Sequence, residues 1–172
     1  MRMGYTIAPG RGDTDLLLAG VAATLMAEGV RLCGTVQINT ACDGEGPCDM
    51  DVRVLPDGPI IRISQSLGPG ARGCRLDPGA LETAIAACEQ RLPGAEALFV
   101  NKFGKQEALG RGFRGLIAEA MALGLPVLVG LNALNRGAFE TFTGGAGEEI
   151  APETVALTEW MRAAIAEARE AA

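Results

Sequence analysis

The sequence predicts an α/β domain of three layers, in which helices cover both faces of a mostly parallel central sheet. Short apolar segments alternate along the chain with longer segments whose apolar residues recur at helical spacing. The connections between the apolar segments are long enough to hold a helix, which favours parallel pairing of the strands. Because 172 residues with 48% hydrophobic residues can bury one core, we expect a single domain over residues 1–172.

The first part of the chain is expected to hold two strands of the parallel sheet, a helix between them and a hairpin. Apolar residues at i, i+3, i+4 and i+7 predict the helix, and Gly29 ends it. Period-two alternation around a Pro-Asp-Gly-Pro turn predicts the antiparallel hairpin, with its arginines on one face. In chain order the elements are a strand over 5–8, a helix over about 14–28, a strand over 32–38 and a hairpin over 51–64, inserted at about 50–65.

The alternation of helices and strands returns in the second part of the chain. Asp77 is a suitable N-cap with proline at the next position, and Gly124 ends a later helix. The strands here are continuous apolar runs, which is typical of strands buried on both faces. The expected elements are helices starting near 78, 113 and 152, strands over 97–100 and 126–131, a loop over 101–112, a short helical piece over 135–142 and a glycine loop over 143–147.

Composition excludes several classes of function. The net charge is −6 and aromatic residues make up 4%, which argues against nucleic-acid partners. The absence of histidine excludes Ser-His-Asp and Cys-His catalysis and His-ligated metals. No apolar run is long enough for a membrane span or a secretion signal, so we expect a cytoplasmic protein without a membrane partner. Two lysines beside thirteen arginines indicate a GC-rich bacterial genome; the oligomeric state stays open.

The connection between the first strand and the first helix is the first candidate binding loop, because ligands of parallel sheets bind beyond the carboxyl ends of the strands. Gly12 and Thr14 match the last glycine and the hydroxyl residue of the phosphate-loop pattern G-x-x-x-x-G-K-[ST], but Asp13 replaces its lysine. One interpretation is a helix-capping turn with Asp13 as N-cap. The other is an anion site built from Arg11 and the backbone amides around Gly10.

A second candidate lies where the strand over 97–100 ends. Asn101 and Lys102 match the start of the guanine-reading motif N-K-x-D, but Gly104 replaces its aspartate, which argues against a GTPase. Asn101 is alternatively a residue that orders the loop through side-chain to backbone bonds. Lys105, Glu107 and the flanked arginine of Gly110-Arg111-Gly112 follow in the same loop. Arg111 suits bidentate recognition of an oxyanion, or is simply solvated.

The cysteines form the third candidate. Cys42, Cys48 and Cys74 lie in polar loops near several aspartates, and thiolates suit zinc, Cu(I) or iron–sulfur. Their spacing matches no zinc knuckle and histidine is absent, so reduced loop cysteines without a ligand role are the alternative, and no metal is expected firmly. Cys33 and Cys88 fall on a strand and a helix stripe and are expected to be small core residues.

A buried strand is followed by Asn-Lys-Phe-Gly-Lys-Gln-Glu, then by Gly-Arg-Gly-Phe-Arg, a helix and Gly-Leu-Pro-Val-Leu. This order of motifs resembles that of a bacterial NTPase-like family, a domain of unknown function often encoded near molybdenum transport or cofactor genes. The layout is also distantly similar to thermophilic-type nucleoside-triphosphatases of the P-loop fold. Those place Asp-Glu-x-Gly-x-x-Glu where this chain has 101–107, so Asn101 and Lys102 replace the acidic pair that serves Mg²⁺ and water.

The resemblance implies a P-loop-NTPase-like topology and a degenerate site. We expect binding of a small anionic ligand, a nucleotide or another oxyanion, in a molybdenum-related role with weak or no hydrolysis. Two alternatives stay open: an active nucleoside-triphosphatase with Mg²⁺ and a charge-swapped site that uses Lys102 and Lys105, and an accessory interaction module without a small ligand. The expected binding residues are Gly10, Arg11, Gly12, Asp13, Thr14, Asn101, Lys102, Gly104, Lys105, Glu107 and Arg111.

Overall fold

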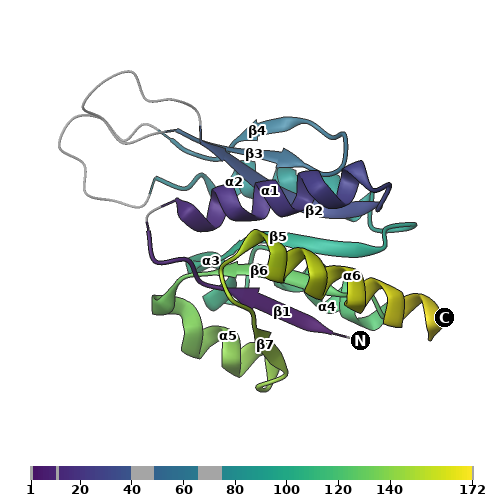
Figure 1. Ribbon diagram of the computed structural model, residues 1–172. Coiled ribbons are helices and arrows are strands. Elements are labelled where there is room, and N and C mark those ends of the chain that lie inside the picture. The colour runs from purple at the N-terminus through teal and green to yellow at the C-terminus, as the bar shows by residue number, and fades with distance from the viewer. Residues whose placement is uncertain (1, 11, 40–48, 66–74, 172) are drawn as a thin grey trace.

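The computed structural model describes residues 2–10, 12–39, 49–65 and 75–171. Its strands form one sheet in the order β4-β3-β2-β5-β6-β1-β7 (Figure 1). The strands are β1 (Met3–Thr6), β2 (Leu32–Asn39), β3 (Met50–Val54), β4 (Ile60–Arg62), β5 (Ala97–Phe103), β6 (Val127–Leu131) and β7 (Gly147–Glu149). The helices are α1 (Asp13–Ala27), α2 (Pro78–Glu89), α3 (Lys105–Ala108), α4 (Arg114–Ala122), α5 (Arg136–Thr143) and α6 (Thr154–Glu170), with a 3-10 turn over Ala133–Asn135.

Helices cover both faces of the sheet, as the sequence predicts. Leu18 of α1 and Met161 of α6 pack in one buried cluster with Phe99 of β5. Ile85 of α2 and Ile117 of α4 pack in the other cluster, together with strand residues that point to the opposite face. Figure 1 shows α1 and α6 side by side on the near face. The three-layer α/β class is therefore confirmed.

The central strands are parallel and adjacent, as predicted. β2 pairs with β5, β5 with β6, and β6 with β1, each in parallel register. The predicted bounds of the first strand were wrong: β1 covers Met3–Thr6, and Ile7 lies just beyond it. The ladder with β6 runs from Met3 opposite Val127 to Thr6 opposite Gly130, and the chain then leaves the sheet.

The structure corrects the predicted loops in two places. The strand predicted over 97–100 continues through Asn101 and Lys102 to Phe103, and the short helix α3 follows inside the predicted loop 101–112. The glycine loop 143–147 leads into β7, which pairs with β1 as a parallel edge strand. Both errors come from short elements that tertiary pairing stabilises, because a three-residue strand or a one-turn helix has little periodicity of its own.

The remaining local predictions hold, with small shifts. β3 and β4 form the antiparallel hairpin, and Arg53 and Arg62 lie on the same face because Arg53 pairs with Ile60 and Arg62 with Asp51. Asp77 caps α2 by accepting from the next two backbone N–H groups after proline. The last helix begins two residues after Pro152 rather than at it.

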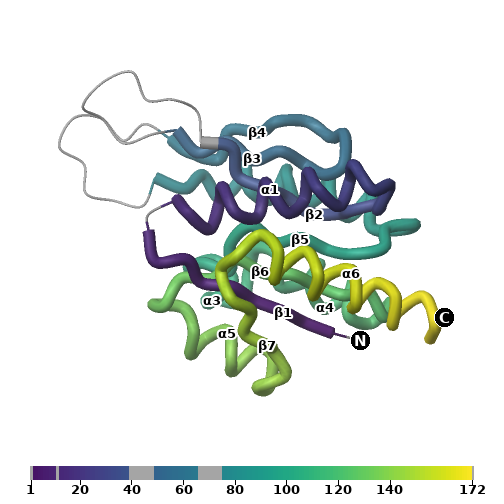
Figure 2. Tube along the Cα trace, in the orientation of Figure 1, coloured from purple at the N-terminus to yellow at the C-terminus, as the bar shows by residue number. Residues whose placement is uncertain are grey.

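Both chain ends lie at the same end of the sheet (Figure 2). The Arg2 guanidinium contacts Glu167 of α6 at 3.1 Å and Glu148 of β7 at 2.9 Å. Among the described residues, no helix has both the length and the apolar character that crossing a membrane requires.

Candidate functional site

A cleft of about 440 Å³ opens beyond the carboxyl ends of β1 and β6. The connection after β1 runs through α1 to β2 on one side, whereas the connection after β6 runs through α5 to β7 on the other. A crevice between connections that diverge in this way is the usual ligand position in an open α/β sheet. The residues that line it are Ile7, Ala8, Pro9, Gly10, Gly12, Thr14, Asp15, Lys102, Leu131, Asn132 and Ala133.

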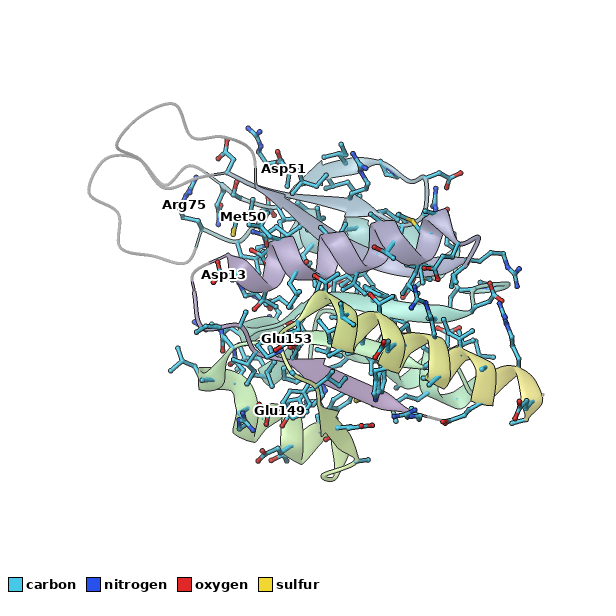
Figure 3. All side chains as sticks on the ribbon, viewed as in Figure 1. Asp13, Met50, Asp51, Arg75, Glu149 and Glu153 are labelled. Atoms are coloured by element: carbon cyan, nitrogen blue, oxygen red, sulfur yellow. The ribbon has the colours of Figure 1, made fainter. Side chains whose placement is uncertain are left out.

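The first turn of α1 forms one wall of the cleft. Gly12 precedes the helix with φ 86°, a left-handed conformation that favours glycine. The predicted N-cap role of Asp13 is wrong, because Gly12 holds that position and no side chain caps the helix. The Asp13 carboxylate folds back against Gly10, where it would meet any Cβ placed on that glycine. Figure 3 shows Asp13 at the start of α1, and it is not among the residues that line the cleft.

Thr14 lies on the cleft side of the same turn. Its side chain is buried, and its Oγ1 accepts the backbone N–H of Ala8 at 3.2 Å. This bond ties the loop after β1 to the helix start. The hydroxyl proton of Thr14 stays available to a group in the cleft, because the backbone bond uses the oxygen only as an acceptor.

A bulge in β5 directs the side chains of Asn101 and Lys102 into different surroundings. Val100 pairs with Val129 and Phe103 with Leu131, so β5 has one more residue than β6 over this stretch. The backbone oxygen of Asn101 lies where a Cβ on Gly130 would be, so glycine is required opposite the bulge. The bulge places the Asn101 side chain in the interior and leaves Lys102 exposed at the cleft.

Asn101 connects three elements of the core. Its Oδ1 accepts the backbone N–H of Gln37 in β2 at 2.9 Å, and its Nδ2 donates to Asp15 Oδ1 of α1 at 2.8 Å. Asn101 and Asp15 are each only 3% exposed. The amide of Asn101 therefore has a partner on each side, which agrees with the interpretation that Asn101 orders the chain by hydrogen bonding.

Lys102 is the cationic side chain that the structure places at the cleft. Within the described part of the chain it has no ion-pair partner. Lys105 and Arg111 are also exposed, but neither lines the cleft. Of the three predicted cations that follow β5, the structure thus brings Lys102 together with the start of α1.

Glu107 supports the backbone after β5. Its carboxylate accepts the N–H of Gly104 at 2.8 Å and the N–H of Phe113 at 3.1 Å. Burial raises the pKa of Glu107 above its usual range, although these two bonds partly oppose the shift. Gly112, at φ +60°, would direct a Cβ onto the same carboxylate. Glu107 and Gly104 therefore belong to a structural bridge from α3 to α4, outside the cleft.

Several predicted residues lie outside the described part of the chain. Arg11 and the three loop cysteines, Cys42, Cys48 and Cys74, are among them. Among the described residues, no group of three or more histidine, cysteine or acidic side chains could hold a metal ion. Cys33 and Cys88 are fully buried, in agreement with the prediction that they are core residues.

Sequence reasoning missed two residues of the cleft. Asp15 is absent from the expected binding residues, although its place in the first turn of α1 beside Thr14 puts it at the cleft. Asn132 follows β6, and its Oδ1 accepts the backbone N–H of Asn135 at 3.1 Å to start the 3-10 turn. The neighbouring positions of β1 and β6 place Asp15 and Asn132 at the same cleft. Hydrophobic periodicity does not reveal the order of strands in a sheet, so the sequence does not indicate these two residues.

The chain matches one family model and resembles two known proteins. The model, described as "Protein of unknown function (DUF2478)", matches residues 5–160. A protein of Bradyrhizobium diazoefficiens named "Molybdenum import ATP-binding protein ModC 2" is 38% identical over 153 residues, which are 87% of this chain and 17% of that protein. The chain thus corresponds to about a sixth of that relative.

A solved structure shares the fold. The solution structure of a human cancer-related nucleoside triphosphatase superimposes with a TM-score of 0.58 at 18% identity, over 87% of this chain and 89% of that one. The likeness covers nearly the whole length of both chains. It confirms the P-loop-NTPase-like topology that the sequence predicts.

Proposed function

The chain belongs to the DUF2478 family, and from that premise we propose that its cleft binds a nucleotide or another small oxyanion, with weak or no hydrolysis. The observation that carries this proposal is the placement of Lys102 beside the first turn of α1 in the crevice between β1 and β6. A helix N-terminus presents backbone N–H groups and the positive end of its dipole to an anion. Lys102 adds a full positive charge without an ion-pair partner among the described residues.

The weak hydrolysis in this proposal follows from the residues at three positions. Efficient phosphoryl transfer needs a phosphate-loop lysine, a held Mg²⁺ ion and a positioned water. Asp13 occupies the lysine position, and its charge opposes an incoming phosphate. Asn101 occupies the metal-carboxylate position, and both ends of its amide are already bonded.

The residues present therefore do not fit a Mg²⁺-nucleotide centre of the usual kind. Thr14 retains a hydroxyl at the cleft, but the carboxylate beside it, Asp15, already accepts a hydrogen bond from Asn101 at one of its two oxygens. We derive no hydrolytic step through a metal from this set. A nucleotide or oxyanion would instead be held by the helix N-terminus and by Lys102.

A molybdenum-related role is a further part of the proposal. It is supported by the relative named as a molybdenum import ATP-binding protein, of which this chain matches 17%. The same match favours a second candidate function, that of an accessory module that acts on a larger partner, because the relative carries the corresponding segment within a much longer chain. The two candidates differ in whether the cleft takes a small ligand.

A thermal-shift panel tests the proposal. The protein is heated with ATP, GTP, ADP, molybdate, tungstate, phosphate and sulfate at low ionic strength, and the titration is repeated at high salt. A binding anion at 100 times its Kd stabilises the folded state by about 2.7 kcal/mol, and the ionic part of binding weakens with salt. Stabilisation by at least one anion in the wild type, lost in Lys102→Ala and retained in Lys105→Ala, supports the proposal.

Two results would contradict it. A panel without any shift leaves the accessory module as the better explanation. Robust Mg²⁺-dependent phosphate release, abolished by Thr14→Ala, would show an active nucleoside-triphosphatase instead.

A further inference from the structure

Asp15 has a carboxylate oxygen without a partner at the cleft. Its Oδ1 accepts from Asn101 Nδ2, and no other described residue bonds to the side chain. No fully buried side-chain oxygen or nitrogen in the described part of the chain lacks a hydrogen bond. Oδ2 must therefore reach solvent, and the solvent that Asp15 meets is the cleft that it lines. A carboxylate 97% buried thus presents one acceptor to whatever enters.

We infer that Asp15 makes the cleft selective for oxyanions that carry a proton, such as hydrogen phosphate, over fully ionised oxyanions such as sulfate and molybdate. The inference rests on the proposed function, since it names the class of anion that the same cleft takes. An ionised carboxylate is an acceptor only, so it needs a donor from the ligand. Hydrogen phosphate and hydrogen arsenate supply an O–H at neutral pH, whereas sulfate and molybdate have only acceptor oxygens.

The cleft supplies complementary groups for the rest of such a ligand. Lys102 and the backbone N–H groups of Gly12 and Thr14 are donors, and they meet the ionised oxygens of the anion. Asp15 Oδ2 meets the protonated oxygen. A fully ionised anion satisfies the donors equally well, but it places an ionised oxygen against the carboxylate. Asp15 Oδ2 then receives no hydrogen bond, and the two negative charges repel each other.

The Asn101 bond makes Asp15→Asn a sharp test. Asparagine has the same shape, and its Oδ1 can still accept from Asn101 Nδ2. Its amide N–H group then replaces the acceptor at the cleft with a donor. The preference between protonated and ionised anions should therefore fall or reverse, while the contact between α1 and β5 remains.

The experiment is calorimetric titration of the full chain with phosphate, arsenate, sulfate and molybdate at neutral pH in the presence of EDTA. In the wild type, phosphate and arsenate should bind about 10- to 100-fold more tightly than sulfate and molybdate, a difference of about 1.4–2.8 kcal/mol. In Asp15→Asn the ratio should fall at least tenfold. The matched control is Asp13→Asn, which also removes one negative charge, two residues away. It should strengthen the binding of all four anions alike and leave the ratio of their affinities unchanged.

The outcomes separate this inference from the proposed function. If no anion binds to the wild type either in EDTA or with Mg²⁺, the proposed function fails. If anions bind in a Lys102-dependent way but the four affinities are similar, only the selectivity by Asp15 is overturned. Phosphate binding that appears only with Mg²⁺ and vanishes in EDTA overturns it as well, because Asp15 would then face a cation. If Asp15→Asn does not fold, the wild-type ranking of the four anions decides alone.

Discussion

Replacing Asn101 with aspartate should destabilise the protein, although it brings position 101 closer to the usual metal-binding residue. Asn101 Nδ2 donates to Asp15 Oδ1 at 2.8 Å, and both side chains are 3% exposed. Asn101→Asp removes the donor and places two carboxylates in contact in the interior. A hydrogen bond to a charged group contributes about 1.5–3 kcal/mol, and leaving a buried charge uncompensated costs about 3–5 kcal/mol.

We therefore expect a loss of about 3–5 kcal/mol at neutral pH. For a chain of this length each kcal/mol lowers the Tm by about 2–4 °C, so the Tm should fall by roughly 6–20 °C. The penalty comes from repulsion between two ionised carboxylates. It is therefore small below about pH 4, where carboxyl groups are largely protonated, and grows as the pH rises.

The assay is thermal unfolding by circular dichroism at neutral pH and below about pH 4. It compares the wild type, Asn101→Asp and the double variant Asp15→Asn/Asn101→Asp. In the double variant the new amide at position 15 can donate to the new carboxylate at position 101. The carboxylate can still accept the backbone N–H of Gln37 with its other oxygen. It should recover most of the lost stability. Equal Tm values for Asn101→Asp and the wild type at neutral pH would contradict this role of the Asn101–Asp15 bond, as would a double variant no more stable than the single one.

Three of the four further predictions concern the backbone bridge from α3 to α4, and the fourth concerns turnover at the cleft. Glu107→Ala leaves the N–H groups of Gly104 and Phe113 unpaired and should cost about 2–4 kcal/mol in chemical denaturation. Burial raises the pKa of Glu107 above its ordinary value of 4.5. The free energy of unfolding of the wild type, relative to Glu107→Gln, should therefore decrease as the pH rises from 4.5 through the folded pKa. A difference in stability that does not change with pH would contradict this. Gly112→Ala combines φ +60° with a clash against Glu107 and should lower the Tm, whereas Gly110→Ala, at φ +84° but in open space, should lower it less. Nucleotide turnover measured by phosphate release should be far below about 10 s⁻¹, and a Thr14-dependent rate near that value would contradict the account.

The sequence predicts the layers of this fold because they follow from long periodic segments. The stripe on α1 and the apolar runs of β5 and β6 are buried as their patterns indicate. The short elements α3 and β7 were missed, since a partner stabilises each of them: Glu107 caps α3, and β1 pairs with β7.

The sequence predicted where the candidate site lies better than it predicted the roles of the individual residues. The loop after β1 and Lys102 were expected from strand ends alone, and they do meet at one cleft. The roles of Asn101 and Asp15 depend on a bulge in β5 and on a bond between residues 86 positions apart. Neither the bulge nor the bond leaves a pattern in the sequence. Lys105 and Arg111 lie in the predicted loop 101–112, but this segment contains the unexpected helix α3, and neither residue lines the cleft.

The start of α1 and Lys102 are proposed to bind an oxyanion together. Amide NMR of the ¹⁵N-labelled protein, titrated with phosphate at low salt, tests it most directly, because it reports affinity and location in one experiment. We expect saturable shifts centred on Gly10, Gly12, Thr14 and Lys102, absent in Lys102→Ala and unchanged in Lys105→Ala. Shifts confined to other parts of the chain, or equal shifts in the Lys102→Ala variant, would contradict it.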